Sequence, residues 1–102
     1  MAAYLIGQIK VKDPQRWKRY VAGVDISLEP FKAKLLMRGE QHQVLAGNNS
    51  FEFAVVIKFE QVTELERWFQ SEAYQALIPL REQAADVSII SYKSNDTEPQ
   101  AE

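Results

Sequence analysis

The sequence predicts a single α+β domain in which a four-stranded antiparallel sheet carries its helices on one face. Three observations predict this fold. A chain of 102 residues has room for one domain. Segments with strand-like alternation and segments with a helical apolar stripe follow one another in the order β-α-β-β-α-β. This order is the split βαβ arrangement of ferredoxin-like domains, whose right-handed crossovers put both helices on the same side of the sheet.

The first predicted elements are a strand and a long helix. Residues Ala3–Val11 alternate and are rich in residue types that favour strands. Asp13 and Pro14 then supply a helix N-cap and a proline at the first helical position. The apolar stripe of this helix follows at three- and four-residue spacing: Trp17, Tyr20, Val21, Val24 and Leu28. Pro30 predicts a break or kink within residues 23–31.

The middle of the chain predicts two further strands. The second strand is expected at residues 34–38, and we expect it to continue through Val44 with a bend at Gly39. Turn-forming residues at 46–50 separate it from a third strand at 52–59, where valine and phenylalanine recur at nearly every second position.

The last part of the chain predicts two helical segments and a fourth strand. Thr63 and Glu66 have the spacing of a capping box, and Ser71 is the expected N-cap of a second helical segment. The fourth strand is expected at residues 87–93. The folded domain therefore covers residues 1–93, and the polar, acidic tail at 94–102 is expected to be disordered.

Side chains alternate across each strand, so the predicted sheet has two distinct faces. The apolar set expected under the helices is Leu5, Ile9, Val11, Leu35, Met37, Phe53, Val55, Ile57, Phe59, Val87 and Ile89. The opposite set is Tyr4, Ile6, Gln8, Leu36, Arg38, Glu40, His42, Ala54, Val56, Lys58, Ile90 and Tyr92. A face open to water should be mostly polar, whereas this one is mixed. We expect a second copy to cover it with two-fold symmetry in a homodimer; an amphipathic surface on a monomer is the alternative.

Composition argues against several classes of function. Twelve basic and fourteen acidic residues occur without a run of lysine or arginine, which argues against nucleic-acid binding. The absence of cysteine excludes disulfides, thiol catalysis and thiolate metal sites. The N-terminus lacks the pattern of a signal peptide, and no apolar run is long enough to cross a bilayer. We therefore expect a cytoplasmic, bacterial-type protein.

Five short stretches between Ala3 and Tyr92 resemble those of a known protein family. They are Tyr4-Leu5-Ile6; Asp13-Pro14 followed by Trp17 and Tyr20; Leu36-Met37-Arg38-Gly39; Val55-Val56-Ile57-Lys58-Phe59; and Ser71-Glu72-Ala73-Tyr74-Gln75-Ala76-Leu77 with Pro79-Leu80-Arg81 close behind. With these stretches the chain resembles the small bacterial family known as domain of unknown function thirteen-thirty, within the dimeric α/β-barrel superfamily. The chain departs from the family in having Ala33-Lys34 in place of a glycine pair and Glu40 in place of a glycine.

The resemblance implies a dimer of two sheets packed face to face, and it implies no settled activity. Members of the wider superfamily include cofactor-free monooxygenases, isomerases, dehydratases, haem enzymes and effector-binding domains. A shared fold therefore does not select one of these functions.

Arg38 and His42 are the candidate catalytic residues. Arg38 falls within an otherwise apolar strand, so it is expected either to pair with an acidic group across the interface or to bind an anionic ligand. His42, the only histidine, is expected on the same strand face as Glu40, whose carboxylate could orient it as a general base. An exposed histidine on an edge strand is the alternative. A single histidine and carboxylates without ligand spacing predict no metal site.

The candidate ligand-binding residues lie on the helices. Trp17, Tyr20 and Trp68 are expected as apolar walls of a cleft between helices and sheet, or as ordinary core residues. Arg81 lies seven residues after Tyr74 on the same helical face, where it either holds Tyr74, reaches the mouth of a pocket, or pairs with a glutamate while its stem covers apolar surface. Gly7 would leave room in such a cleft.

Two classes of function follow. The first is binding of a small apolar or aromatic molecule, with conversion of that molecule without a cofactor as a further step. The second is a non-catalytic dimerisation or effector-sensing module, in which the same residues hold the interface. The sequence shows no nucleophile elbow, phosphate loop or dinucleotide fingerprint that would choose a reaction.

Overall fold

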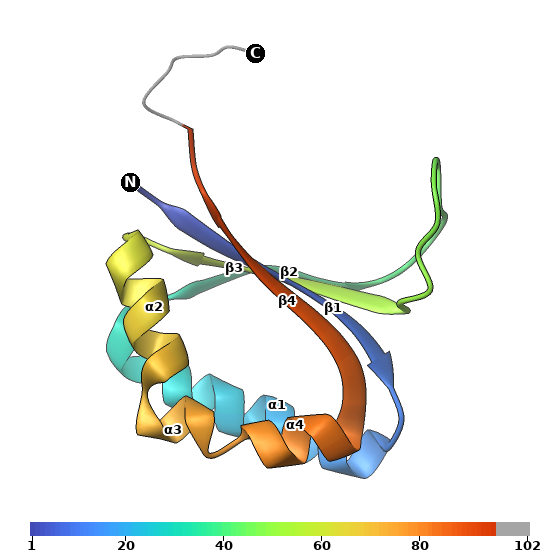
Figure 1. Cartoon of the computed structure of the whole chain (residues 1–102), viewed down its shortest axis with the longest axis horizontal. Helices are drawn as coiled ribbons and strands as arrows, with labels where there is room; N and C mark the ends of the chain where they lie inside the picture. Colours follow the sequence, from blue (N-terminus) through green and yellow to red (C-terminus); the bar gives the residue numbers. More distant parts are fainter. Residues whose placement is uncertain (96–102) are drawn as a thin grey trace.

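The computed structural model describes residues 1–95, whose helices and strands follow the predicted order (Figure 1). The elements are β1 (Ala3–Val11), α1 (Pro14–Leu28), the 3₁₀ helix η1 (Glu29–Phe31), β2 (Lys34–Glu40), β3 (Phe53–Phe59), α2 (Val62–Gln70), α3 (Glu72–Gln75), α4 (Ile78–Ala84) and β4 (Ala85–Lys93). The tail predicted to be disordered lies, from residue 96 onward, outside the described residues.

The four strands form one antiparallel sheet in the order β2-β3-β1-β4. All of the helices lie on the same side of this sheet, and its other side is left open (Figure 1). The predicted α+β, ferredoxin-like fold is therefore confirmed.

Helix α1 begins after an N-cap residue and ends shortly before a proline. The Asp13 side chain accepts hydrogen bonds from the backbone N–H groups of Gln15 and Arg16, and Pro14 occupies the first helical position. The Arg16 backbone N–H, followed by its guanidinium, lowers the pKa of the Asp13 carboxyl. The α-helix ends at Leu28, and Pro30 lies in η1, so the break falls inside the predicted interval.

The core is a cluster of aromatic rings between α1, α2, α3 and the sheet. Trp68, Tyr74 and Phe59 are its largest fully buried side chains. The ring centroids of Trp68 and Tyr74 lie 4.4 Å apart, and those of Trp68 and Phe59 lie 5.8 Å apart. The Trp68 indole N–H donates to Ser27 Oγ at 2.9 Å, which satisfies its polar atom inside the core. The predicted stripe of α1 packs against this cluster.

Because of a bulge in β2, several side chains lie on the opposite face of the sheet from the one predicted. The pairing of β2 with β3 shifts register at Leu36, so the alternation of side chains moves by one position beyond it. Arg38 lies opposite Val55 and Glu40 lies opposite Phe53, both on the helix side of β3. Arg38 and Glu40 therefore face the helices, whereas the uninterrupted alternation predicted them on the open face.

Strand β2 is also shorter than predicted. It ends at Glu40 instead of continuing to Val44, and residues 41–52 form an extended arm that rises away from the helices (Figure 1). At the base of the arm the Gln41 N–H donates to the Glu52 carbonyl oxygen at 2.7 Å. Further along, the Asn49 side chain donates to Gln8 Oε1 at 2.7 Å. The arm removes His42 from the strand face on which it was expected.

The second helical region differs from the prediction in two details. Helix α2 begins at Val62 after Gln61, and no side chain caps it, so the predicted capping box of Thr63 and Glu66 is wrong. Gln61 has an extended backbone, so the chain enters the helix two residues earlier than a Thr63 cap would require. Ser71 caps α3 by accepting the Tyr74 N–H, as predicted, and the segment after it divides into α3 and α4.

Candidate functional site

An apolar cavity of about 580 Å³ lies between α1 and the helix-side face of the sheet. Its walls come from all four strands and from α1 and α2, and include Leu5, Ile9, Trp17, Val21, Val55 and Ile89. Gly7 also lines it, and a Cβ at this position would approach Val55 Cγ1 to 3.0 Å. The volume and the apolar walls are those of a site for a small organic molecule.

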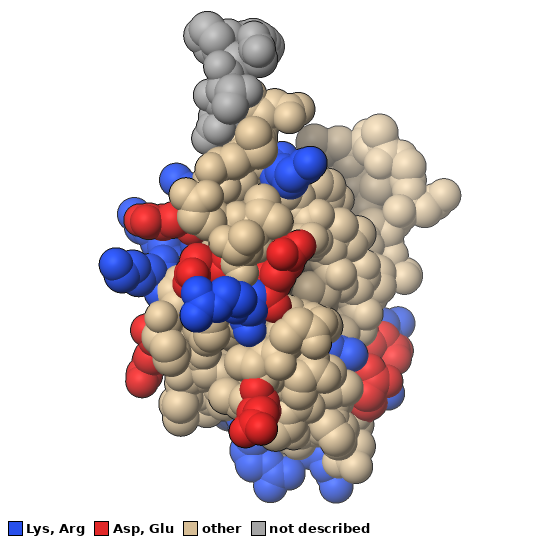
Figure 2. All heavy atoms as spheres, turned by 60° about the vertical axis from the view of Figure 1, so that its left-hand side comes forward, with Lys and Arg blue, Asp and Glu red and all other residues tan. Residues whose placement is uncertain are grey.

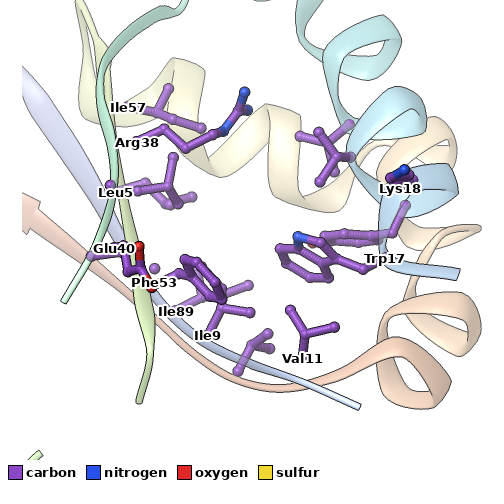
Figure 3. Close-up of a pocket in the computed structure, with 18 of the residues that line it drawn as sticks. Leu5, Ile9, Val11, Trp17, Lys18, Arg38, Glu40, Phe53, Ile57 and Ile89 are labelled. Carbon is purple, nitrogen blue, oxygen red and sulfur yellow. The ribbon is translucent and has the colours of Figure 1, made fainter. Parts of the chain in front are cut away.

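The charged residues of the cavity stand on two facing elements (Figure 3). Arg38 and Glu40 extend from β2, and Trp17 and Lys18 lie opposite them on α1. Arg38 and Glu40 face the cavity because the bulge at Leu36 turns their side chains from the open face toward the helices. The cavity thus combines apolar walls with two cations and one carboxylate.

Within residues 1–95, Arg38 forms an ion pair with Asp25. Its Nη2 lies 4.0 Å from Oδ1 of Asp25 on α1, and both side chains are more than half exposed. An exposed pair at this distance contributes little to stability. The acidic partner expected across an interface is therefore found in the same chain, and the guanidinium can exchange it for an anionic ligand at small cost.

A chain of hydrogen bonds lies behind the α1 wall of the cavity. The Tyr20 and Tyr74 hydroxyl oxygens are 2.8 Å apart, and Arg81 Nη1 donates to the Tyr74 oxygen at 2.9 Å. Arg81 Nη2 also donates to Glu82 at 2.9 Å, so two of the roles predicted for Arg81 occur together. Burial, followed by the neighbouring Tyr74, raises the pKa of Tyr20, which keeps its phenol neutral at any physiological pH.

The structure brings most of the predicted site residues together. Arg38, Trp17, Tyr20 and Trp68 line the cavity. Tyr74 is fully buried, and hydrogen bonds connect Arg81 to Tyr74 and Tyr74 to Tyr20.

His42 lies apart from this group. It is exposed on the arm and lines a separate groove between the arm and the sheet. Its catalytic role stays a prediction. Lys18 was not predicted as a site residue, and Glu40 was predicted only as the carboxylate that could orient His42. The apolar run Leu35-Leu36-Met37 is compatible with either strand face, so it did not show that Glu40 faces the helices.

One face of the molecule carries charged side chains of both signs. On the face drawn in Figure 2, Lys and Arg side chains are interspersed with Asp and Glu. Within residues 1–95, no three potential metal-ligating side chains gather into a group. The helices of this part of the chain are too short or too polar to cross a membrane.

The open face of the sheet carries exposed apolar side chains. Ile90 is 45 % exposed and Tyr92 is 49 % exposed, on the face opposite the helices. Met37, predicted under the helices, joins them because of the bulge and is 44 % exposed. Ile6 and Val56 lie half-buried between them. Together these five residues form an apolar patch on the open face.

Solved structures with the same fold support this architecture. The chain is similar to a protein of unknown function from Rhodopseudomonas palustris (TM-score 0.78, 12% identity, 91% of this chain and 82% of that one). It is also similar to a dimeric ferredoxin-like protein of unknown function from Jannaschia sp. (TM-score 0.72, 9% identity, 92% and 100%). A third is SnoaB, a cofactor-independent oxygenase from Streptomyces nogalater (TM-score 0.67, 6% identity, 97% and 98%). At these identities the likeness shows the fold alone.

The amino-acid sequence identifies the family to which this chain belongs. The model of the family described as Domain of unknown function (DUF1330) matches residues 2–93. The chain belongs to this family, which confirms the predicted resemblance. No curated protein matches the chain.

Proposed function

We propose that this member of the DUF1330 family is a cytoplasmic homodimer whose cavity binds a small, planar, largely apolar molecule that carries an acidic group. The observation that carries the proposal is the cavity between α1 and the sheet, with its apolar walls and with Arg38 and Lys18 on opposite sides. Flat rings pack well against Trp17, Tyr20 and Trp68, while a carboxylate matches the guanidinium of Arg38.

The open face supports the homodimer in this proposal. Its patch of Ile6, Met37, Val56, Ile90 and Tyr92 would otherwise stand in water. A two-fold axis through this face would bury the same patch of both copies. The related fold from Jannaschia sp. is described as dimeric, which is consistent with such packing.

Filling the cavity is expected to abolish ligand binding. Val21 lies on α1 and lines the cavity, so Val21→Phe places a ring in the space that the ligand needs. Isothermal titration with naphthalene-2-carboxylate and fluorene-2-carboxylate should show binding to the wild type and a loss of at least about tenfold in affinity in the variant.

The matched control is Ile26→Phe, which introduces the same ring at an exposed position of the same helix. Ile26 is 66 % exposed and does not line the cavity, so this variant should bind as the wild type does. Absence of binding to the wild type at millimolar probe, or equal loss in both variants, would contradict the proposed site.

Conversion of the ligand is a second candidate, favoured by the position of Glu40. Its carboxylate lies two residues from Arg38 on the same side of β2, at the edge of an apolar cavity. Such a carboxylate can take a proton from the carbon beside a ligand carbonyl, while the electron pair moves to the carbonyl oxygen. In this reaction Lys18 holds the acid group of the ligand, which leaves Arg38 free to stabilise the enolate. The proton then returns to carbon, so no cofactor is needed.

The wild type should therefore exchange hydrogen for deuterium beside the carbonyl of 2-indanone-5-carboxylate faster than buffer does, as followed by NMR in D2O. Glu40→Gln should lower the catalysed rate by about a hundredfold. Glu29→Gln, which changes an exposed carboxylate outside the cavity lining, is the control and should leave the rate unchanged. Binding without exchange above background would favour the non-catalytic, effector-sensing alternative.

A further inference from the structure

We infer that the Tyr20 hydroxyl donates a hydrogen bond into the cavity, so that the site selects planar acids that also carry a carbonyl oxygen. This inference rests on the proposed ligand site and adds to it a second point of recognition, distant in sequence from Arg38. The hydrogen bonds among Arg81, Tyr74 and Tyr20 support it, because each of their donors needs an acceptor.

The Tyr74 oxygen already accepts one hydrogen bond, from Arg81 Nη1 at 2.9 Å. An arginine guanidinium only donates, so this bond has a single possible direction. The Tyr74 hydroxyl hydrogen then needs an acceptor, because Tyr74 is 0 % exposed and water cannot reach it. The Tyr20 oxygen, 2.8 Å away, is the acceptor that the structure provides.

The opposite direction would be unfavourable. If Tyr20 donated to Tyr74, the Tyr74 oxygen would accept twice, and its own hydrogen would be buried without a partner. A buried donor without an acceptor carries the full cost of its lost hydration. Donation therefore runs from Arg81 to Tyr74 and from Tyr74 to Tyr20.

This direction leaves the Tyr20 hydroxyl hydrogen unused. Tyr20 lines the cavity, and among the described residues that line it no other carries a hydroxyl group. Burial holds the phenol in its neutral form, in which it can donate. The Arg81 cation at the far end of this hydrogen-bond chain polarises both hydroxyl groups in the same sense, which strengthens Tyr20 as a donor.

A carbonyl oxygen is the group that this donor fits. Most of the surrounding wall is hydrocarbon from Val21, Val24 and their neighbours, so an oxygen placed there without a partner would be penalised. An aromatic ketone or quinone acid offers an acceptor without a hydrogen of its own. A purely hydrocarbon acid leaves the Tyr20 donor without a partner.

The test uses two probes that differ at one position: fluorene-2-carboxylate and 9-oxofluorene-2-carboxylate, in which a carbonyl replaces a methylene. Isothermal titration of the wild type should show about tenfold tighter binding of the ketone. Tyr20→Phe should remove this preference and leave the affinity for fluorene-2-carboxylate within about twofold. Trp17→Phe, which removes the indole N–H from the same wall, should keep the preference.

Because Tyr20→Phe also leaves Tyr74 without an acceptor, a second measurement uses the wild type alone. The infrared carbonyl band of bound 9-oxofluorene-2-carboxylate should lie at a lower wavenumber than the band of the free ketone in an apolar solvent. Equal affinity for both probes, or a preference lost in Trp17→Phe and kept in Tyr20→Phe, would overturn the role of Tyr20 and leave the proposed site intact. Failure of both probes to bind would overturn the site and the inference together.

Discussion

Replacement of Ile90 by aspartate is expected to convert the proposed homodimer into a folded monomer. Ile90 lies on the open face of β4 and is 45 % exposed, so a carboxylate there stays hydrated in the single chain. In the dimer, the substitution would bury two carboxylates in an apolar interface, each at a cost of several kcal/mol. The dissociation constant should rise by at least about a thousandfold, as measured by analytical ultracentrifugation.

Ile26→Asp is the control for this experiment. Ile26 is 66 % exposed on α1, which lies on the helix side of the sheet, so its replacement should leave the dimer unchanged. Circular dichroism should show that both variants are folded. An Ile90→Asp variant that dimerises as tightly as the wild type would show that the open face is not the interface.

Replacement of Trp68 by alanine is expected to cause the largest loss of stability. Trp68 is 2 % exposed, contacts the rings of Phe59 and Tyr74, and donates to Ser27. Its removal leaves a cavity in the core and a buried hydroxyl without its donor, which together cost about 3–5 kcal/mol. This is a large part of the total stability of a small domain, roughly 5–15 kcal/mol. Chemical denaturation followed by circular dichroism measures the loss.

Trp17→Ala removes the less buried of the two tryptophans that line the cavity. Trp17 is half-buried and lines the cavity, so its removal should cost less stability and mainly weaken the binding of fluorene-2-carboxylate. Equal destabilisation by the two substitutions would show that Trp17 belongs to the core and not to a ligand site.

The sequence predicted the fold because its local signals agree with one another. The alternation in β1, the Asp13-Pro14 start of α1 and the Ser71 cap each specify their element without help from distant residues. The apolar stripe of α1 likewise identified the residues that pack on the core.

The site was predicted only in part, because its geometry depends on pairing between distant segments. Leu35, Leu36 and Met37 are all apolar, so no change of pattern marks the bulge that turns Arg38 and Glu40 into the cavity. The seven-residue spacing of Tyr74 and Arg81 predicted their contact, and the contact forms although Tyr74 lies in α3 and Arg81 in α4. The contact of Tyr20 with Tyr74 spans 54 positions and leaves no local signal.

The central claim is that a homodimer holds a small planar acid between α1 and the sheet. Native mass spectrometry of the freshly purified protein, before and after addition of fluorene-2-carboxylate, tests it most directly. The expected result is a dimer that carries a small molecule from the cell or takes up the probe, with neither mass present in Val21→Phe. A monomer at micromolar concentration, or a dimer that carries nothing and takes up no probe, would contradict the claim.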